Sequence, residues 1–447
     1  MANKENNIKN IVESKLCNSC GACIASCPFN IIKKDNDNIP RVSEENCINC
    51  GICKQVCQGT GVDFLRYYEK FHKKPYNMET TLGDYQGAYL SFANNDNVRQ
   101  KGTSGGFIKA FLVSLLETSK IQGAILISSD EKECFKAKAI VARSKEDILN
   151  TGKSKYSRSL TLDVLKEIEN ESGKFAIVGL PCQIQALWKI RKLNPKINNR
   201  ILVTIGLFCH AQVEVVAKRI IFKKFGLDKL NIKEYISRYG KHPGTPHVRL
   251  ENDDIIPVYF PKKKFFRPTS HEVLNVMYHL YTPKRCMYCF DGASELADIS
   301  VGDPWFKKRD LKNFKDIKNI NFNDGYSFVL VRSDIGNELI NFAFENNAIS
   351  IKELPKEIAD KCNKKMLKSK KLRAWYFIKK EGKVDFGDYE KLIPNLSQEK
   401  LLKQRISNIF HILCFYPSIR NFILKILLSN FGYIFLYINN LKRKFKK

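Results

Sequence analysis

Eight of the fifteen cysteines lie within the first 57 residues and repeat one spacing. Each run has three cysteines separated by two residues and a fourth after three more: Cys17, Cys20, Cys23 and Cys27, then Cys47, Cys50, Cys53 and Cys57. Three thiolates at this spacing can wrap one 4Fe-4S cubane, while the fourth is carried to a neighbouring cluster. We therefore predict two clusters. One is held by Cys17, Cys20, Cys23 and Cys57, and the other by Cys47, Cys50, Cys53 and Cys27.

The repeated spacing is that of bacterial two-cluster ferredoxins. Gly21 and Gly51 occupy equivalent positions, where the backbone must approach the inorganic core closely. The runs differ after the fourth cysteine, because Pro28 follows Cys27 whereas Gln58 follows Cys57. We expect Gln58 to affect loop rigidity and not ligation. Two zinc sites are the alternative, but zinc seldom uses such a run.

Four further cysteines suggest a third site. Cys182 and Cys209 follow short apolar runs, 175–180 and 201–208, that are typical of buried parallel strands. Ligands in open α/β sheets bind beyond the carboxyl ends of such strands. We hypothesise a third 4Fe-4S cluster held by Cys182, Cys209, Cys286 and Cys289. The alternatives are small buried hydrophobes for the first two and a zinc site or redox dithiol for the CxxC pair. We interpret Cys134, Cys362 and Cys414 as structural.

Two polar loops are candidates for binding an organic cofactor. Thr103, Ser104, Gly105 and Gly106 precede an amphipathic helix over 107–116, and free N–H groups there favour a phosphate or a flavin edge. Simple helix capping by Thr103 or Ser104 is the alternative. Ser154, Lys155 and Tyr156 form a second loop, for which plain solvation is the alternative.

The elements that position these residues alternate between strand and helix. Strands are expected at 88–93, 123–128, 175–180, 201–208 and 326–331, with helices at 107–116 and 213–221 and another capped by Asp334. This alternation indicates an α/β or α+β body. We expect four units: a 4Fe-4S module at 1–75, domains at 80–165 and 166–350, and a basic tail at 351–447.

Composition limits the class of protein. The 447 residues are 44% hydrophobic, which excludes global disorder. The N-terminus lacks the apolar stretch of a secretory signal, so we expect a cytoplasmic protein whose clustered cysteines bind metal. The net charge is +29, yet residues 1–70 carry nine Lys or Arg and eight Asp or Glu. The excess therefore lies in the body and tail.

The tail has a composition of its own. Residues 401–447 contain nine Lys or Arg and no acidic residue, and their longest stretch without Lys or Arg, 426–441, has 16 residues. That is shorter than the roughly 20 residues that span a bilayer. One interpretation is an amphipathic helix on an anionic membrane surface at the inner face of the membrane. The other is a helical hairpin packed on the body with a solvated basic end.

Motifs over residues 80–345 resemble the beta subunits of coenzyme F420 hydrogenases and dehydrogenases, whose coenzyme is an 8-hydroxy-5-deazaflavin. The matching segments are 87–89, 104–106, 154–156, 178–183, 206–209, the CxxC at Cys286 and Cys289, and the long run Glu295–Pro304. Family members with an added ferredoxin module resemble residues 1–75. The last hundred residues lie outside the resemblance.

The resemblance implies an FAD-containing α/β flavoprotein core that carries its own 4Fe-4S cluster. It identifies both polar loops as flavin contacts, and we expect Lys155 to bind an FAD phosphate or the N1 side of the ring. The function implied is an oxidoreductase that passes electrons between a ferredoxin-like partner and a two-electron organic carrier or substrate. The alternative is a non-catalytic electron-transfer subunit or an accessory protein in surface-polysaccharide biosynthesis. The basic charge favours an acidic ferredoxin- or flavodoxin-like partner, an anionic substrate or a membrane surface over nucleic acid.

Overall fold

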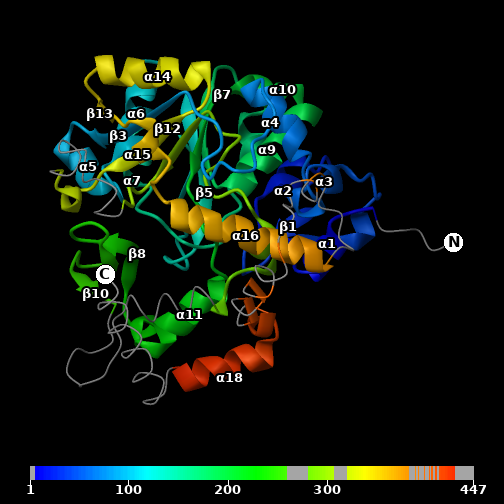
Figure 1. The fold of residues 1–447 in the computed structure, drawn as a ribbon. Helices are drawn as coiled ribbons and strands as arrows, with labels where there is room; N and C mark the ends of the chain where they lie inside the picture. Colours follow the sequence, from blue (N-terminus) through cyan, green and yellow to red (C-terminus); the bar gives the residue numbers. More distant parts are fainter. Residues whose placement is uncertain are drawn as a thin grey trace.

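The computed structural model describes residues 6–258, 280–306 and 320–381. Beyond these it describes residues 388, 391, 397, 402, 404, 405, 408, 409 and 412–427. Figure 1 shows three parts, namely an N-terminal module, a core built on a large sheet, and a smaller sheet accompanied by helices.

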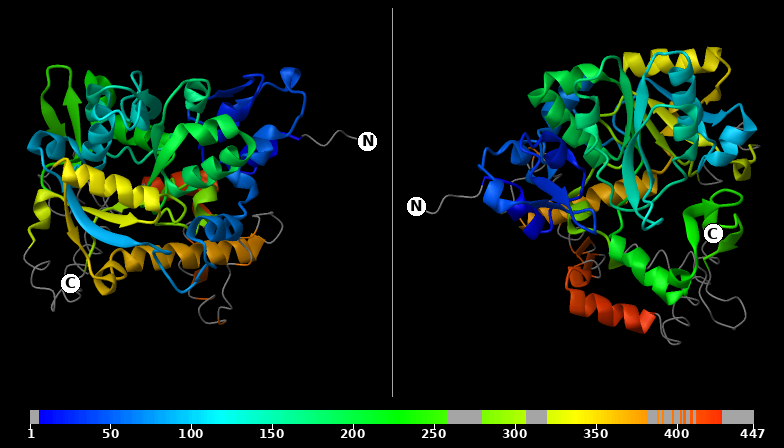
Figure 2. Two further views of the ribbon diagram at one scale, coloured as in Figure 1. Left: turned by 90° about the horizontal axis from the view of Figure 1, so that it is seen from above. Right: turned by 180° about the vertical axis from the view of Figure 1, so that it is seen from behind.

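The N-terminal module consists of short elements around the eight clustered cysteines. They are α1 (Lys9–Glu13), α2 (Ala22–Ser26), the antiparallel pair β1 (Ile32–Lys34) and β2 (Pro40–Val42), η1 (Glu44–Asn46), α3 (Ile52–Gln55), η2 (Gln58–Thr60) and α4 (Phe64–His72). α2 and α3 each begin after a glycine with positive φ, +91° at Gly21 and +80° at Gly51. In Figures 1 and 2 the module lies beside α9 (Pro181–Leu193) and α10 (Pro195–Arg200), at one side of the large sheet.

The large sheet has eight strands in the order β13-β3-β12-β11-β7-β6-β4-β5. Their bounds are β3 (Gly87–Ala93), β4 (Gly123–Ser129), β5 (Ala137–Ala142), β6 (Phe175–Gly179), β7 (Ile201–Leu207), β11 (Ile299–Gly302), β12 (Ser327–Val331) and β13 (Ile349–Glu353). The four central strands β4, β6, β7 and β11 are parallel, and the outer pairs are antiparallel. The expected parallel pairing of the strands before Cys182 and Cys209 is therefore confirmed.

Helices cover both faces of this sheet, which explains why its central strands are apolar without alternation. α6 (Phe107–Glu117) and α14 (Asp334–Glu345) pack on one face against Ala124, Ala176 and Val203. On the other face α9 and α10 pack against Ile125 and Ile177. The remaining short helices of this part are α5 (Asp96–Lys101), α7 (Lys145–Asn150) and α8 (Leu165–Ile168).

The expected cap of α14 is displaced by one residue. The side chain of Ser333, and not that of Asp334, accepts a hydrogen bond at 3.2 Å from the N–H of Gly336. Asp334 is instead the first helical residue, where its negative charge complements the helix dipole.

A second sheet, of order β10-β9-β8, is formed by β8 (Ile232–Tyr239), β9 (Thr245–Leu250) and β10 (Ile255–Pro257). Its neighbours along the chain are α11 (Val215–Lys224), η3 (Leu227–Lys229) and η4 (Lys284–Tyr288), followed later by η6 (Phe322–Asp324), α15 (Lys356–Ala359) and α16 (Lys364–Glu381). Figure 1 shows α16 running from the region of α15 to the N-terminal module. Ala374 and Phe377 of α16 share a buried apolar cluster with Ile8 and Met287.

The described part of the C-terminal tail contains α18 (Pro417–Leu427). Leu424 is buried, whereas Ile419, Phe422 and Ile426 are exposed on the helix. Arg420 pairs with Glu214 at 3.0 Å. In the part of the chain that the structure describes, no helix is long and apolar enough to cross a membrane. The basic end of the tail, 442–447, lies outside the described residues.

Candidate functional site

The four cysteines of the first predicted set (Cys17, Cys20, Cys23 and Cys57) lie together. The pKa of the Cys17 thiol is raised to about 11, first by burial and then by the nearby Cys57. Burial also raises the pKa values of Cys20 and Cys23, and Cys57 again contributes to both. Cys57 of the second run has therefore joined the three spaced cysteines of the first run.

The second set (Cys27, Cys47, Cys50 and Cys53) shows the reciprocal exchange. The pKa of Cys53 is raised to about 11, mainly by burial, and the charges of Cys47, Cys50 and Cys27 add to the increase. All fifteen cysteines, each of them a described residue, are free of disulfide bonds. The thiols of each set are thus neighbours that have not cross-linked.

The surroundings of these thiols fit iron-sulfur clusters. The N–H of Ser19 donates to Sγ of Cys17, and the N–H of Gly59 donates to Sγ of Cys57, both at 3.3 Å. Such bonds stabilise the thiolate form, which is the form that binds metal. Several buried thiolates at one place repel one another unless a cationic centre joins them. The donor set and its hydrogen bonds therefore suit a 4Fe-4S cluster.

The core set (Cys182, Cys209, Cys286 and Cys289) also converges. Cys182 lies in the first turn of α9, Cys209 follows β7, and Cys286 and Cys289 lie in and after η4. Burial raises the pKa of Cys182 well above its usual value, and the next causes are the charges of Cys289, Cys209 and Cys286. The carboxyl ends of β6 and β7 thus meet the CxxC loop at one place.

Two buried cations of α16 face this core set. Nζ of Lys370 donates to the backbone oxygen of Cys209 at 2.6 Å. Arg373 donates through Nη2 to the oxygens of His210 at 3.1 Å and Cys286 at 3.4 Å. Both cations oppose the effect of burial, which raises the pKa of Cys209 to about 12. Sequence reasoning placed these residues in a basic tail and missed them.

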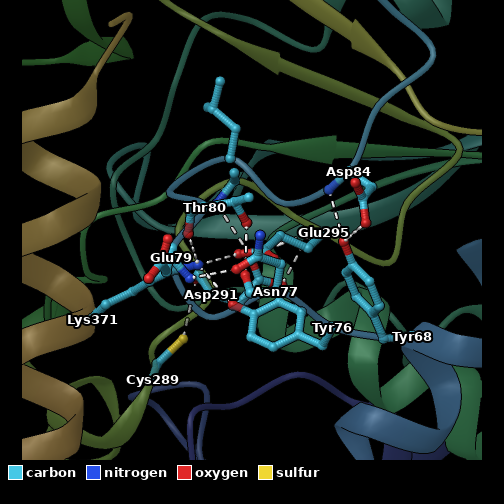
Figure 3. Close-up of polar contacts among 12 residues, drawn as sticks. Tyr68, Tyr76, Asn77, Glu79, Thr80, Asp84, Cys289, Asp291, Glu295 and Lys371 are labelled. Atoms are coloured by element: carbon cyan, nitrogen blue, oxygen red, sulfur yellow. Dashed lines mark hydrogen bonds and ion pairs between the residues drawn. The ribbon is translucent and has the colours of Figure 1, made fainter. Parts of the chain in front are cut away.

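A buried polar network ties the CxxC loop to its neighbours (Figure 3). Sγ of Cys289 donates to the backbone oxygen of Asp291 at 3.4 Å. The Asp291 carboxylate accepts the N–H of Glu295 at 3.2 Å. Glu295 is fully buried and pairs at 3.0 Å with Lys371 of α16, whose Nζ also donates to the Tyr76 hydroxyl at 2.7 Å. The network fixes the loop that carries Cys289.

A cavity of about 1330 Å³ adjoins the core set. Cys209 is part of its lining, and so are six of the seven predicted flavin contacts: Thr103, Ser104, Gly106, Ser154, Lys155 and Tyr156. The seventh, Gly105, stands behind the wall with φ of +67°, and a Cβ there would lie 2.9 Å from the backbone of both Ser327 and Ser91. The two polar loops and one core cysteine therefore share a single cavity.

The two polar loops contact each other directly. Oγ1 of Thr103 accepts the N–H of Ser154 at 3.0 Å and its hydroxyl at 3.2 Å. The hydroxyl of Ser104 donates to the backbone oxygen of Tyr326. Neither side chain caps α6, because the residue before that helix is Gly106 with φ of +71° and no side-chain bond. The capping alternative is therefore wrong.

Lys155 is buried, so plain solvation does not apply to this residue, whereas Tyr156 of the same loop is 40% exposed. Nζ of Lys155 donates to Oγ of Ser129 at 2.6 Å and lies 3.9 Å from Glu234. Burial lowers the pKa of Lys155. The cavity lining contains nine lysine or arginine residues and one acidic residue, Asp303, which pairs with Arg238 at 2.7 Å.

Comparisons with protein families match three regions. The model of the coenzyme F420 hydrogenase/dehydrogenase beta subunit N-terminus matches residues 88–166, and that of the C-terminus of the same subunit matches residues 172–357. A 4Fe-4S dicluster domain model matches residues 9–58. The two beta subunit models together cover the large sheet, the core set and the cavity loops.

Several known proteins are similar. The coenzyme F420-dependent sulfite reductase of Methanocaldococcus jannaschii is 28% identical over 369 residues, which are 78% of this chain and 49% of the reductase. The chain thus spans about half the length of that relative. A subunit of the F(420)H(2) dehydrogenase of Methanosarcina mazei is 25% identical and covers 78% of this chain and 88% of its own. The beta subunit of the coenzyme F420 hydrogenase of Methanococcus voltae is 26% identical and covers 61% and 86%.

A solved structure shares the fold. A chain of the F420-reducing [NiFe] hydrogenase complex from Methanosarcina barkeri superposes with a TM-score of 0.51. It is 23% identical and covers 67% of this chain and 94% of its own.

Proposed function

The chain belongs to the family of coenzyme F420 hydrogenase/dehydrogenase beta subunits, and we propose that it is an iron-sulfur flavoprotein oxidoreductase. It passes electrons between a ferredoxin-like one-electron partner and a two-electron organic carrier or substrate. The carrier is a deazaflavin-type coenzyme or a reducible metabolite. A flavin supplies the exchange between one-electron and two-electron chemistry that such a protein needs.

One observation carries this proposal. The same cavity reaches the glycine-rich turn at Thr103–Gly106, the loop at Ser154–Tyr156 and Cys209 of the core set. A cofactor bound by the two loops would therefore lie beside the core set. The volume of the cavity, about 1330 Å³, exceeds the roughly 300–1,000 Å³ of common small-molecule sites, so the cavity has room for a large cofactor and a substrate together.

The chain's own residues would hold FAD through backbone and hydroxyl groups. Gly105 and Gly106 have φ values of +67° and +71°, a conformation that glycine adopts readily and that leaves this turn without side chains. Thr103 and Ser154 bond to each other and keep the two loops in register. Lys155 lines the cavity, and its Nζ is held by the hydroxyl of Ser129 at 2.6 Å.

The three cysteine sets are arranged in series. The charge of Cys20, in the first set, is close enough to Cys182 of the core set to raise its pKa. The first set likewise neighbours the second, because Cys53 contributes to the raised pKa of Cys23. We therefore propose the path second set, first set, core set, FAD, substrate, with the second set nearest to the external partner.

The charge of the cavity supports an anionic substrate. Nine lysine or arginine residues against one acidic residue exceed what the diphosphate of FAD requires. The same excess of positive charge on the body supports an acidic ferredoxin- or flavodoxin-like partner. The exposed apolar residues of α18 support an additional contact with an anionic membrane surface.

The proposal is tested by the carrier that reduces the flavin. The full chain is purified anaerobically and mixed with reduced deazaflavin coenzyme, with NADH or with reduced ferredoxin, while the flavin absorbance near 450 nm is followed. Rapid bleaching of the flavin by reduced deazaflavin supports the proposal. Rapid bleaching by reduced ferredoxin, with electrons flowing in the opposite direction along the path, supports it as well. A preparation that contains clusters but no flavin would contradict it and favour a non-catalytic electron-transfer subunit.

A further inference from the structure

The two cysteine runs of the N-terminal module differ in the residue after their fourth cysteine. Pro28, after Cys27, is exposed to solvent, whereas Gln58, after Cys57, is only 1% exposed. Since the runs otherwise share their spacing, the burial of Gln58 reflects what it faces. Its side chain faces the core, where it contacts the loop that carries the CxxC pair.

The group that Gln58 contacts is Arg285, the residue before the core ligand Cys286. Nη2 of Arg285 donates to the backbone oxygen of Gln58 at 3.0 Å and to its Oε1 at 2.8 Å. Arg285 is 2% exposed, so the whole guanidinium is buried between the two modules. The side chain of Arg285 thus connects the loop of Cys286 to the residue next to Cys57.

A second cation supports the same side of the first set. Nζ of Lys189, on the helix whose first turn contains Cys182, donates to the oxygens of Cys57 at 2.7 Å and Gly61 at 2.9 Å. These bonds hold the η2 turn against α9. In the second set, Nζ of Lys166 donates in the same way to the backbone oxygen of Cys27, so a lysine meets the fourth cysteine of each run, and Arg285 is the further cation on the side of Cys57.

We propose that Arg285, held in place by Gln58, is a positioning residue that poises the electron step from the second set to the first set and the core set. The inference rests on the clusters of the proposed function. A fixed positive charge stabilises the cluster state that has gained an electron, and it acts strongly because the site is buried. Arg285 thereby raises the reduction potentials of the two clusters that flank it relative to that of the second set. Electrons that enter at the second set therefore move towards clusters of higher reduction potential.

The step moves one electron and no atoms. The electron leaves a reduced cluster on the second set and enters an oxidised cluster on the first set, from which it passes to the core set. No covalent bond forms or breaks, and Arg285 is itself neither oxidised nor reduced. Its part is electrostatic and geometric, and it does not donate a proton.

The experiment is a redox titration of the reconstituted full chain, followed by EPR. Arg285→Gln removes the charge, Arg285→Lys keeps it, and Gln58→Glu leaves Arg285 in place but adds a carboxylate that neutralises it. Arg41→Gln is the control. Arg41 is an exposed cation of β2 in the N-terminal module, and it pairs at 2.9 Å with Asp35. Iron is counted in every preparation.

We expect two of the three reduction waves to shift to lower potential in Arg285→Gln and in Gln58→Glu. Arg285→Lys and Arg41→Gln should keep the wild-type values. Unchanged potentials in Arg285→Gln at full iron content would overturn the inference and leave Arg285 as a simple structural clamp. If Arg285→Gln fails to fold, unchanged potentials in Gln58→Glu have the same meaning.

The proposed function can fail separately. Wild-type protein with about eight irons instead of about twelve would lack the core cluster and contradict the proposed path. Arg285 would then still be tested on the two remaining waves, one of which should shift in Arg285→Gln while the other stays. Two unshifted waves would overturn the inference in that case as well.

Discussion

At the scale of single residues, two buried cations of α16 hold the backbone around the cysteines of the core set. Lys370 and Arg373 are buried cations that bond to the backbones of Cys209 and Cys286. Burying a cation is costly unless negative charge compensates it. The proposed cluster, ligated by four thiolates, would supply that charge and would account for the joint burial of the cations and thiols.

Removing core cysteines tests this assignment. Cys286→Ser and Cys289→Ser should each lower the iron content by about four per chain, because one cubane loses a ligand. Cys362→Ser is the control, since Cys362 is also a buried cysteine but contacts the backbone oxygen of Asp303 and the side chain of Asn363 instead of other thiols. Iron analysis and EPR give the result. Equal iron in the wild type and both CxxC variants would refute the core cluster.

The flavin loops are tested at Gly105. Gly105→Ala places a Cβ 2.9 Å from the backbone of Ser327 and Ser91, so the turn must shift and flavin content should fall several-fold. Gly240→Ala is the control, because Gly240 has φ of +85° but no neighbour within 4 Å of the new Cβ. It shares the backbone strain and not the clash. Flavin absorbance per protein gives the result, and equal loss in both variants would count against a role of the turn.

Residue types and spacing predicted much of the site. The four-cysteine spacing led to both exchanged ligand sets, which the structure places together, because a repeat constrains geometry locally. The sequence could not reveal that Gln58 and Arg285 meet, since 227 positions separate them and neither belongs to a repeat. Contacts of that kind depend on how the modules dock.

At the scale of elements, α4 links the module to the core through His72. Nε2 of His72 is 2.8 Å from the backbone oxygen of Glu295. Burial lowers the pKa of His72 to about 4, so the folded protein holds it neutral where the unfolded chain, with a pKa near 6.5, would protonate it. The unfolded state therefore binds more protons between these values, and stability must fall as the pH decreases.

We expect His72 to contribute about 2 kcal/mol to the loss of stability between pH 6.5 and pH 4. His72→Gln should show a flatter pH dependence over this range, whatever its stability at pH 7. His247→Gln serves as the control, because that ring makes a solvent-exposed bond to the backbone oxygen of Thr245 at the start of β9. Urea unfolding at several pH values measures the effect. Parallel pH curves for the wild type and His72→Gln would contradict it.

The helix α16 shows where reasoning by element failed. Its lysine density led to its assignment to a basic tail, but Lys370, Lys371 and Arg373 are buried and face the core set and Glu295. A helical face that also contains Leu367 and Ala374 was a signal for packing, because these positions recur at intervals of three and four. The sequence showed that the helix is positively charged. Only the tertiary structure showed that the thiols of the core set and the buried Glu295 lie opposite these charges.

At the scale of the whole molecule, the parallel centre of the sheet followed from the sequence, but its strand order did not. Apolar runs identify buried strands, whereas the antiparallel addition of β12, β3 and β13 depends on connections that single-strand patterns do not encode. The cavity, bounded by loops from both halves of the sheet, could not be predicted for the same reason.

The exposed apolar face of α18 is a candidate contact surface of the whole molecule. Phe422 is 64% exposed and lies near Ile419 and Ile426 on the same helix. If this face contacts anionic lipid, Phe422→Glu should weaken binding to phosphatidylglycerol vesicles at least roughly tenfold, since burial of one such side chain is worth about 1.5–3 kcal/mol. Phe344→Glu, on α14, is a control of similar exposure. Identical vesicle flotation of both variants and the wild type would end the membrane proposal.

The central claim is that one chain joins three clusters to a flavin. The most direct measurement is the amount of iron and flavin bound by the anaerobically purified full chain. We predict about twelve irons and one FAD per chain, because twelve cysteines form three sets and one cavity adjoins the last of them. About eight irons without flavin would contradict the account and leave only a ferredoxin module on an inactive core.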